Sequence, residues 1–251
     1  RNAYKAIDAI NLLNSEESQG IFESIVNNDA RDEVRAAALC RVTNQDFVMR
    51  IFNDNTNDLI RVAAAQAMTS ADSLKEIAIE NKSAKVRDMA IYYLSTIDSE
   101  ALKEVALSYS ESASMVFYYL KDDDFALEIL CNSSIRTSDE VKRAAFSSIK
   151  SQEKLCEAVL HCNHLGLAQQ NVSRIVDQRL LMKIAITPYK ISEKARALIT
   201  DVSVLNEVKR IKEQKQDKAN LSREEIDANA DEGFYRENKR NCECSKYYNM
   251  H

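Results

Sequence analysis

The chain has 251 residues and contains only three Gly and one Pro, too few turn-forming residues for a β-sandwich or a β-barrel. Apolar residues make up 45% of the chain and charged residues 29%, so it can bury a continuous core and is not disordered overall. The formal net charge of −5 argues against a nucleic-acid-binding protein, which needs a basic face to displace counterions.

The first predicted elements form an amphipathic helix pair over Tyr4 to Leu13 and Ile21 to Val26. A pattern with a period of 26 residues then begins: Val34-Arg35-Ala36-Ala37-Ala38 returns as Ile60-Arg61-Val62-Ala63-Ala64 and as Val86-Arg87-Asp88-Met89-Ala90. A fixed period in this range indicates one supersecondary unit that stacks on its neighbours. Small side chains at the third and fourth positions after each start let neighbouring helices approach closely.

Two helices are predicted in each unit. The first helices begin at Val34, Ile60, Val86, Ser112, Val141 and Leu167. The second helices follow a short polar turn and have a Leu-x-Glu-apolar-apolar signature at Leu74–Ala78 and Leu102–Ala106, with weaker copies at Leu155–Val159 and Leu181–Ala185. A last pair is predicted over Glu193–Ile199 and Val204–Ile211. The sequence therefore predicts an all-α, right-handed α-solenoid of about eight short antiparallel helix pairs over residues 1–211.

Residues 212–251 are predicted to be a charged C-terminal extension. Lys212 to Lys218 is a charged run without an apolar stripe, and Ser222-Arg223-Glu224-Glu225 is a capping box for a short helix that would end near Gly233. Four aromatic residues beyond this point favour docking of the extension over full solvation. One hypothesis is that the extension folds back into a groove of the solenoid and is displaced by a partner.

The Val-Arg-x-x-Ala helix, the Asp-containing turn and the Leu-x-x-apolar-Ala helix resemble HEAT-type repeats in a short version, over roughly residues 30–210. This resemblance implies a curved, HEAT- or armadillo-like superhelix with the second helices on the concave side. It also implies binding of other macromolecules as the usual function.

Two columns of charged residues recur with the period. Arg35, Arg61 and Arg87, continued by Lys142, are interpreted as scaffold, because arginine near a repeat boundary can bond a neighbouring carboxylate and a carbonyl of the adjacent repeat. The second helices carry a glutamate column at Glu76, Glu104, Glu128 and Glu157. This column would form an acidic stripe for a basic partner, although glutamate is also a common residue of solvated helix faces.

Four tyrosines lie one period apart in pairs, Tyr92-Tyr93 and Tyr118-Tyr119. Neighbouring repeats carry Cys40-Arg41, Gln66-Ala67 and Ser147-Ser148 at this position, which indicates partial exposure. The tyrosines are candidates for a partner-binding patch, since tyrosine is favoured at interfaces, or they pack under an irregular neighbouring repeat.

Candidates for metal binding or catalysis are sparse. Cys156, His161, Cys162 and His164 lie at a predicted helix end but point in different directions, and Cys242, Cys244 and His251 supply only three ligands. The chain has no glycine-rich phosphate loop, no Gly-x-Ser-x-Gly elbow and no His-Glu-x-x-His helix. The sequence therefore predicts a protein without cofactor or metal that is not an enzyme.

The predicted function is a scaffold or adaptor that binds a protein or peptide segment along the concave second-helix surface, without nucleic acid or membrane. The chain has no run of 18 apolar residues, no signal-peptide pattern and no disulfide spacing among its six Cys, which predicts a cytoplasmic location. The alternative is an enzyme or nucleic-acid-modifying protein of lyase type on the same scaffold, with His161, Cys162 and His164 as its only titratable cluster.

Overall fold

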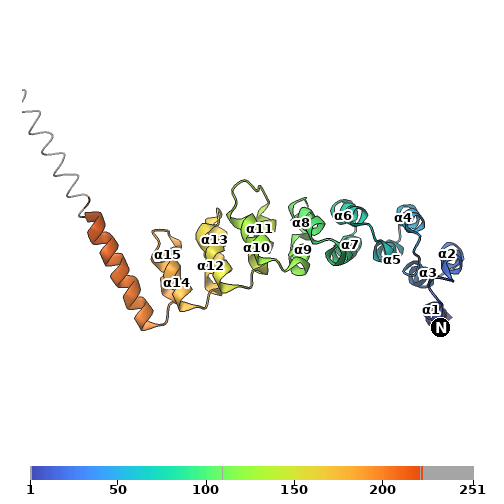
Figure 1. Cartoon of the computed structure of the whole chain (residues 1–251), viewed down its shortest axis with the longest axis horizontal. Helices are drawn as coiled ribbons and strands as arrows, with labels where there is room; N and C mark the ends of the chain where they lie inside the picture. Colours follow the sequence, from blue (N-terminus) through green and yellow to red (C-terminus); the bar gives the residue numbers. More distant parts are fainter. Residues whose placement is uncertain (1, 109, 221, 223–251) are drawn as a thin grey trace, which may run out of the picture. The chain divides into compact units, whose positions relative to one another are not determined.

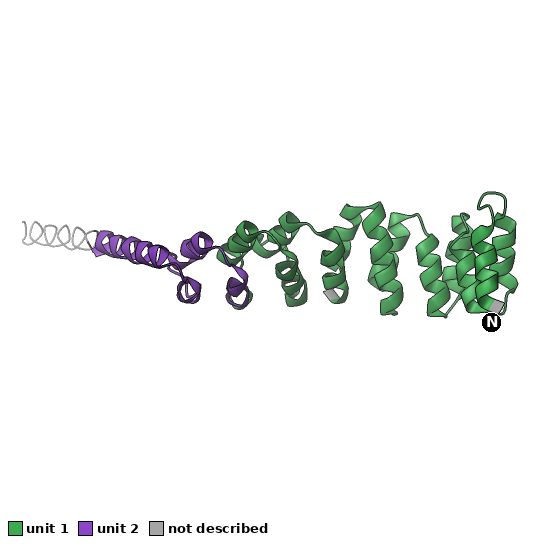
Figure 2. Cartoon of the chain, turned by 90° about the horizontal axis from the view of Figure 1, so that it is seen from below, with its two compact units in different colours: residues 1–167 green, residues 168–251 purple. Residues whose placement is uncertain are grey.

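The computed structural model describes residues 2–108, 110–220 and 222, and over these residues it is helical without any β-strand. The chain divides into two compact units, 1–167 and 168–251 (Figure 2). None of the helices in the described part is long and apolar enough to cross a membrane. The all-α prediction is confirmed, and the described helices taken in chain order make eight consecutive pairs.

In unit 1 the helices are α1 (Asn2–Leu12), α2 (Gln19–Asn28), α3 (Asp32–Leu39), α4 (Gln45–Asp54), α5 (Asp58–Ala67), α6 (Ala71–Glu80), α7 (Ala84–Ile97), α8 (Ser99–Ser108), η1 (Ser110–Ser112), α9 (Ala113–Leu120), α10 (Asp123–Cys131), α11 (Asp139–Ser148) and α12 (Gln152–His161). Helix α13 (Leu165–Asn171) crosses the boundary between the units, and unit 2 continues with η2 (Val172–Arg174), α14 (Gln178–Ala185), α15 (Ile191–Leu198) and a helix over 202–220. The predicted boundary after Ile211 falls inside this last helix. The predicted capping box at Ser222 to Glu225 lies almost entirely outside the described residues.

Unit 1 consists of two layers of helices. The first-helix layer contains α1, α3, α5, α7, α9 and α11, and each of these helices packs on the next one. The second-helix layer contains the even-numbered helices from α2 to α12, and those from α2 to α10 each pack on the first helix of the following pair, as α2 on α3 and α4 on α5 (Figure 1). The predicted starts Val34, Ile60 and Val86 all lie in the first-helix layer and are buried.

Small residues explain the close packing of the first-helix layer. Ala38, Ala64 and Ala90 occupy equivalent positions in α3, α5 and α7, and all three are fully buried. With only a methyl group at these positions, the helix backbones can approach one another closely. The residues two positions later, Cys40, Gln66 and Tyr92, are partly or fully exposed and contribute to the outer surface of the layer.

Polar side chains connect consecutive pairs. Gln45, the first residue of α4, donates to the Ala67 carbonyl at 3.1 Å and accepts from the Thr69 N–H at 3.0 Å. Gln19 at the start of α2 bonds Arg41 and Thr43 in the same way. These glutamine braces satisfy backbone groups between helices that would otherwise lack protein partners.

The starts of the first helices are connected as well. Asn57 donates to Asp32 at 2.6 Å, and Ser83 donates to Asp58 at 2.7 Å. In both cases the aspartate is the first residue of one first helix, and the donor is the residue just before the following first helix. The register of α3, α5 and α7 is thus fixed at one end, which sets the positions of the side chains on their outer surface.

Candidate functional site

The four predicted tyrosines form one continuous row on the first-helix layer. The ring centroids of Tyr93 and Tyr92 lie 4.9 Å apart, those of Tyr92 and Tyr119 5.5 Å, and those of Tyr119 and Tyr118 5.1 Å. All three contacts are edge-on or tilted, as aromatic quadrupoles prefer. Tyr92 is 42% exposed and Tyr118 67% exposed, so the row lies at the surface instead of under a neighbouring repeat.

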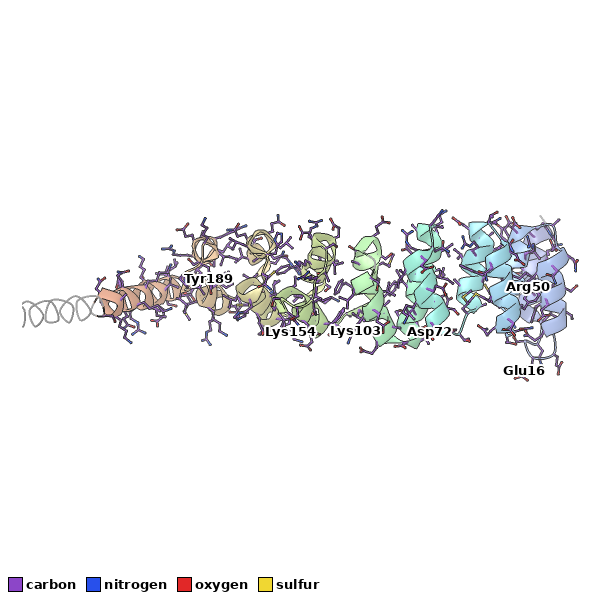
Figure 3. The ribbon with its side chains drawn as sticks, turned by 90° about the horizontal axis from the view of Figure 1, so that it is seen from above. Glu16, Arg50, Asp72, Lys103, Lys154 and Tyr189 are labelled. Atoms are coloured by element: carbon purple, nitrogen blue, oxygen red, sulfur yellow. The ribbon has the colours of Figure 1, made fainter. Side chains whose placement is uncertain are left out.

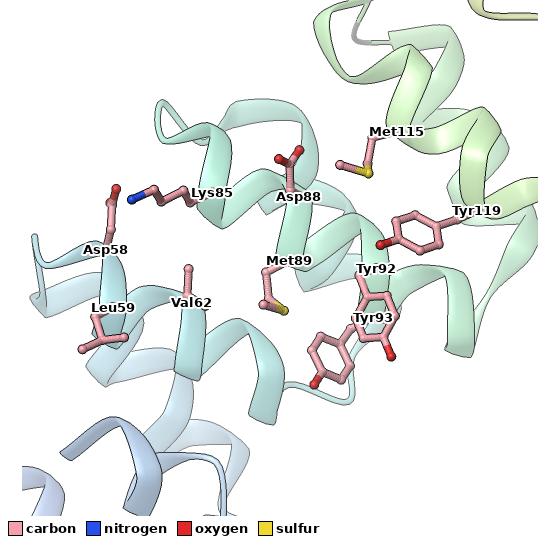
Figure 4. A pocket seen from close by; sticks show the side chains of 10 residues that line it. All are labelled: Asp58, Leu59, Val62, Lys85, Asp88, Met89, Tyr92, Tyr93, Met115 and Tyr119. Atoms are coloured by element: carbon pink, nitrogen blue, oxygen red, sulfur yellow. The ribbon is translucent and has the colours of Figure 1, made fainter. Parts of the chain in front are cut away.

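Three of these tyrosines line a groove of about 630 Å³ across α5, α7 and α9, shown in Figure 4. We call it the tyrosine groove; its lining residues are Asp58, Leu59, Val62, Lys85, Asp88, Met89, Tyr92, Tyr93, Met115 and Tyr119. Seven of these ten side chains are aliphatic, thioether or aromatic. Charged groups lie at the rim, so the groove combines an apolar floor with polar edges, as binding sites commonly do.

Helical periodicity places these side chains on one surface of α7. The groove-lining residues of α7 are separated by one, three or four positions, which places them on one surface of the helix. They are Lys85, Asp88, Met89, Tyr92 and Tyr93. The opposite surface of α7 carries the buried residues of the core. Burial raises the pKa of the Tyr93 hydroxyl, consistent with its position deeper in the groove than Tyr92.

A second groove of about 320 Å³ continues the same surface between α9 and α11. We call it the lysine groove; its lining residues are Ser114, Phe117, Tyr118, Lys121, Asp123, Ala144, Ser147, Ser148 and Lys150. Tyr118 lines this groove while its neighbour Tyr119 lines the tyrosine groove. The pair of rings therefore joins the two grooves.

The glutamate column lies on the other layer, in α6, α8, α10 and α12. Glu76, Glu104, Glu128 and Glu157 are all exposed. Lysines alternate with these acids: the Lys75 ammonium lies 2.8 Å from a Glu104 carboxylate oxygen on the next second helix, which raises the pKa of Lys75.

Two further lysines on this layer are Lys103 and Lys154, which are labelled in Figure 3. Their ammonium groups lie 3.3 Å from an Asp122 oxygen and 2.6 Å from an Asp124 oxygen, respectively. The pKa values of both lysines are raised, chiefly by side-chain hydrogen bonds to Glu100 and Asp124 respectively. The second-helix surface therefore carries several ion pairs, and Glu104 of the glutamate column takes part in one of them. Its role as an acidic stripe for a basic partner stays a prediction.

The arginine column divides into bonded and unbonded members. Arg35 donates to the Val26 carbonyl at 2.8 Å and to Asp32 at 3.1 Å, and Arg87 donates to the Asn81 carbonyl at 2.8 Å and to Glu111 at 3.4 Å. These bonds are those expected of a scaffold role. Arg61 differs: its guanidinium makes no hydrogen bond or ion pair of this kind in the described part of the chain and lies 4.6 Å from the centre of the Phe52 ring.

The cysteine and histidine cluster has structural contacts. The ring Nδ1 of His164 accepts from the Leu167 N–H at 3.1 Å, at the start of α13, and the Cys162 thiol accepts from the His164 N–H at 3.3 Å. Cys156 is buried and His161 exposed. Over the residues that the structure describes, no three His, Cys, Asp or Glu side chains come together as metal ligands do. Cys242, Cys244 and His251 lie outside the described residues.

Sequence reasoning found the tyrosines and missed the residues around them. Val62 and Met89 belong to the repeating pattern, and Leu59 and Met115 gave no signal in the sequence, yet all four line the tyrosine groove. Lys121 and Lys150 gave no signal, because each lies just beyond the end of a helix and outside the repeating pattern. Comparison with known proteins finds no matching family model, and no curated protein or solved structure with significant similarity.

Proposed function

We propose that this chain is a HEAT-like α-solenoid that binds a segment of a partner protein, without catalysis, across the outer surface of its first helices. The observation that carries this proposal is the tyrosine groove with its continuous row of four tyrosines. Tyrosine supplies a large apolar contact area with few rotatable bonds and a polar hydroxyl at its tip, which is why it is enriched among the residues that dominate binding energy.

The chemistry of the lining supports a peptide-like ligand. The floor contains two methionines, whose flexible thioethers adapt to different side chains, beside the rigid tyrosine rings. The groove is open along the layer, since it runs over α7 from α5 to α9. An extended or helical segment with one or two large apolar anchors would bury these surfaces.

The test is a selection from a random peptide display library on the purified chain, followed by affinity measurement for the enriched peptides. We expect enriched peptides with aromatic or aliphatic anchors, and a Kd that rises at least about tenfold on the variant Tyr92→Ala/Tyr119→Ala. Tyr189→Ala removes another exposed tyrosine, in unit 2, and should leave the Kd unchanged. Enrichment of no peptide, or equal affinity for the wild type and the double variant, would contradict the proposal.

A further inference from the structure

The two lysines of the lysine groove differ from the lysines of the second-helix layer. Lys75, Lys103 and Lys154 each contact a carboxylate. In the described part of the chain, neither Lys121 nor Lys150 makes an ion pair or a side-chain hydrogen bond, and both are exposed. Two ammonium groups at one groove without carboxylate partners form a local positive site on a chain of net charge −5.

The one carboxylate in this groove is already engaged. Asp123 accepts from the backbone N–H groups of Lys150 at 3.2 Å and Ser151 at 2.9 Å, as a brace between consecutive pairs. Its oxygens are therefore directed at the backbone, and the two ammonium groups remain available to a ligand. An anionic group at this place would gain two charge-assisted contacts.

We infer that the partner segment carries an acidic side chain beside its apolar anchor, and that this carboxylate binds between Lys121 and Lys150. The inference rests on the proposed function, because it concerns the segment that occupies the tyrosine groove. The Tyr118 and Tyr119 rings, 5.1 Å apart, connect the two grooves, so one continuous segment can reach both. The ligand is thus an acidic-flanked apolar segment, in contrast to the basic partner predicted for the glutamate column.

The geometry also sets the spacing. The lysine groove lies between α9 and α11, so its centre is one and a half helix–helix spacings from α7. Packed helices lie about 8–10 Å apart, which makes this distance about 12–15 Å. An extended chain advances about 3.3 Å per residue, so the acidic residue should lie about four residues from the apolar anchor. The full surface from α5 to α11 covers three such spacings, about 24–30 Å, which corresponds to a segment of about seven to nine residues.

The experiment uses synthetic peptides of about ten residues with a shared Leu-Phe-Met centre and, about four residues to one side, a pair of Glu, Gln or Lys residues. Each pair is made on the N-terminal and on the C-terminal side, because the direction of the segment is open. Fluorescence polarisation should give a Kd about tenfold lower for the better Glu peptide than for its Gln counterpart, with the Lys peptide weakest. High salt should reduce this preference.

Variants of the chain identify the lysines. Lys121→Gln/Lys150→Gln should bind the Glu and Gln peptides equally, and Lys121→Glu/Lys150→Glu should prefer the Lys peptide. A second version, Lys121→Gly/Lys150→Gln, removes both charges and places glycine where the backbone φ is 50°, so folding is preserved. The matched control Lys5→Gln/Lys82→Gln changes two exposed lysines outside the groove and should keep the preference.

Three results would overturn the inference: equal Kd values of the Glu and Gln peptides on the wild type, an equal loss of preference in the control variant, or no binding by any of the peptides. In the last case, the display selection would decide the proposed function separately. A further pattern is that the peptides bind the Tyr92→Ala/Tyr119→Ala variant more weakly than the wild type, while the Glu and Gln peptides have equal Kd values. This result would support the proposed function and contradict the inference of an acidic residue in the partner segment.

Discussion

The glutamine brace at the start of α4 makes a quantitative prediction about how neighbouring pairs stabilise each other. In Gln45→Ala, the Ala67 carbonyl and the Thr69 N–H lose their bonds to the side-chain amide, at 3.1 and 3.0 Å. Each bond of this kind contributes about 0.5–1.5 kcal/mol, and the site is only partly buried, so we expect a loss of about 1–2 kcal/mol in the free energy of unfolding. Urea unfolding followed by circular dichroism should show a lower midpoint with an unchanged m value.

Two variants control this experiment. Gln66→Ala removes an exposed glutamine of α5 and should change the free energy of unfolding by less than about 0.5 kcal/mol. Gln45→Glu keeps an acceptor for the Thr69 N–H but loses the donor to Ala67, so its midpoint should lie between those of the wild type and Gln45→Ala. A midpoint for Gln45→Ala equal to that of Gln66→Ala would refute the role of the brace.

Three further substitutions are predicted from packing, capping and backbone conformation. Ala64→Leu, at a fully buried position, should cost about 1–3 kcal/mol or more in urea unfolding, and an unchanged midpoint would show that the layer is not closely packed. Asp122→Ala should cost about 1–2 kcal/mol at pH 7, because this carboxylate accepts the N–H groups of Phe125 and Asp124 at 2.9 and 3.0 Å. The hydrogen bond from the Phe125 N–H and, after it, the contact with Lys103 lower the pKa of Asp122 below its ordinary value. The stabilisation is therefore present above the pKa of Asp122 in the unfolded state and is lost as the pH falls through its pKa in the folded state. The melting temperatures of the wild type and Asp122→Ala should converge below pH ~4. Lys121→Gly should raise the free energy of unfolding by about 0.5–1 kcal/mol, since φ is 50° there, and a lower midpoint would contradict this.

The helices could be predicted because burial and local propensity agree in this chain. Val34, Ile60 and Val86 recur with the period and are buried, so their pattern reports directly on the core. The end of the last helix could not be predicted in the same way. Residues 212–220 have no apolar stripe, yet they continue the helix that starts at 202, because lysine, glutamate and glutamine are good helix formers without a buried face.

The arginine column was predicted as one set with the same role. In the structure, the contacts of each arginine depend on the residue that the following pair places beside it. Arg87 contacts Glu111, whereas the residue at the equivalent position relative to Arg61 is Lys85, a like charge. Without a carboxylate there, the Arg61 guanidinium packs on Phe52. A recurring residue type therefore predicts the position of a side chain, and the non-recurring residue opposite decides its bonds.

The same reasoning connects the tyrosine row to function. Tyr92 and Tyr118 occupy the register position that Gln66 holds in α5 and Ser147 holds in α11. The helices with glutamine and serine form equally well, so the fold does not require an aromatic ring at this exposed position. Two consecutive repeats nevertheless place tyrosine pairs there, where the rings contact each other and expose apolar surface to water. Exposed aromatic surface of this kind adds little to folding stability until a partner covers it, which makes the departure from the repeat the strongest argument for a binding surface.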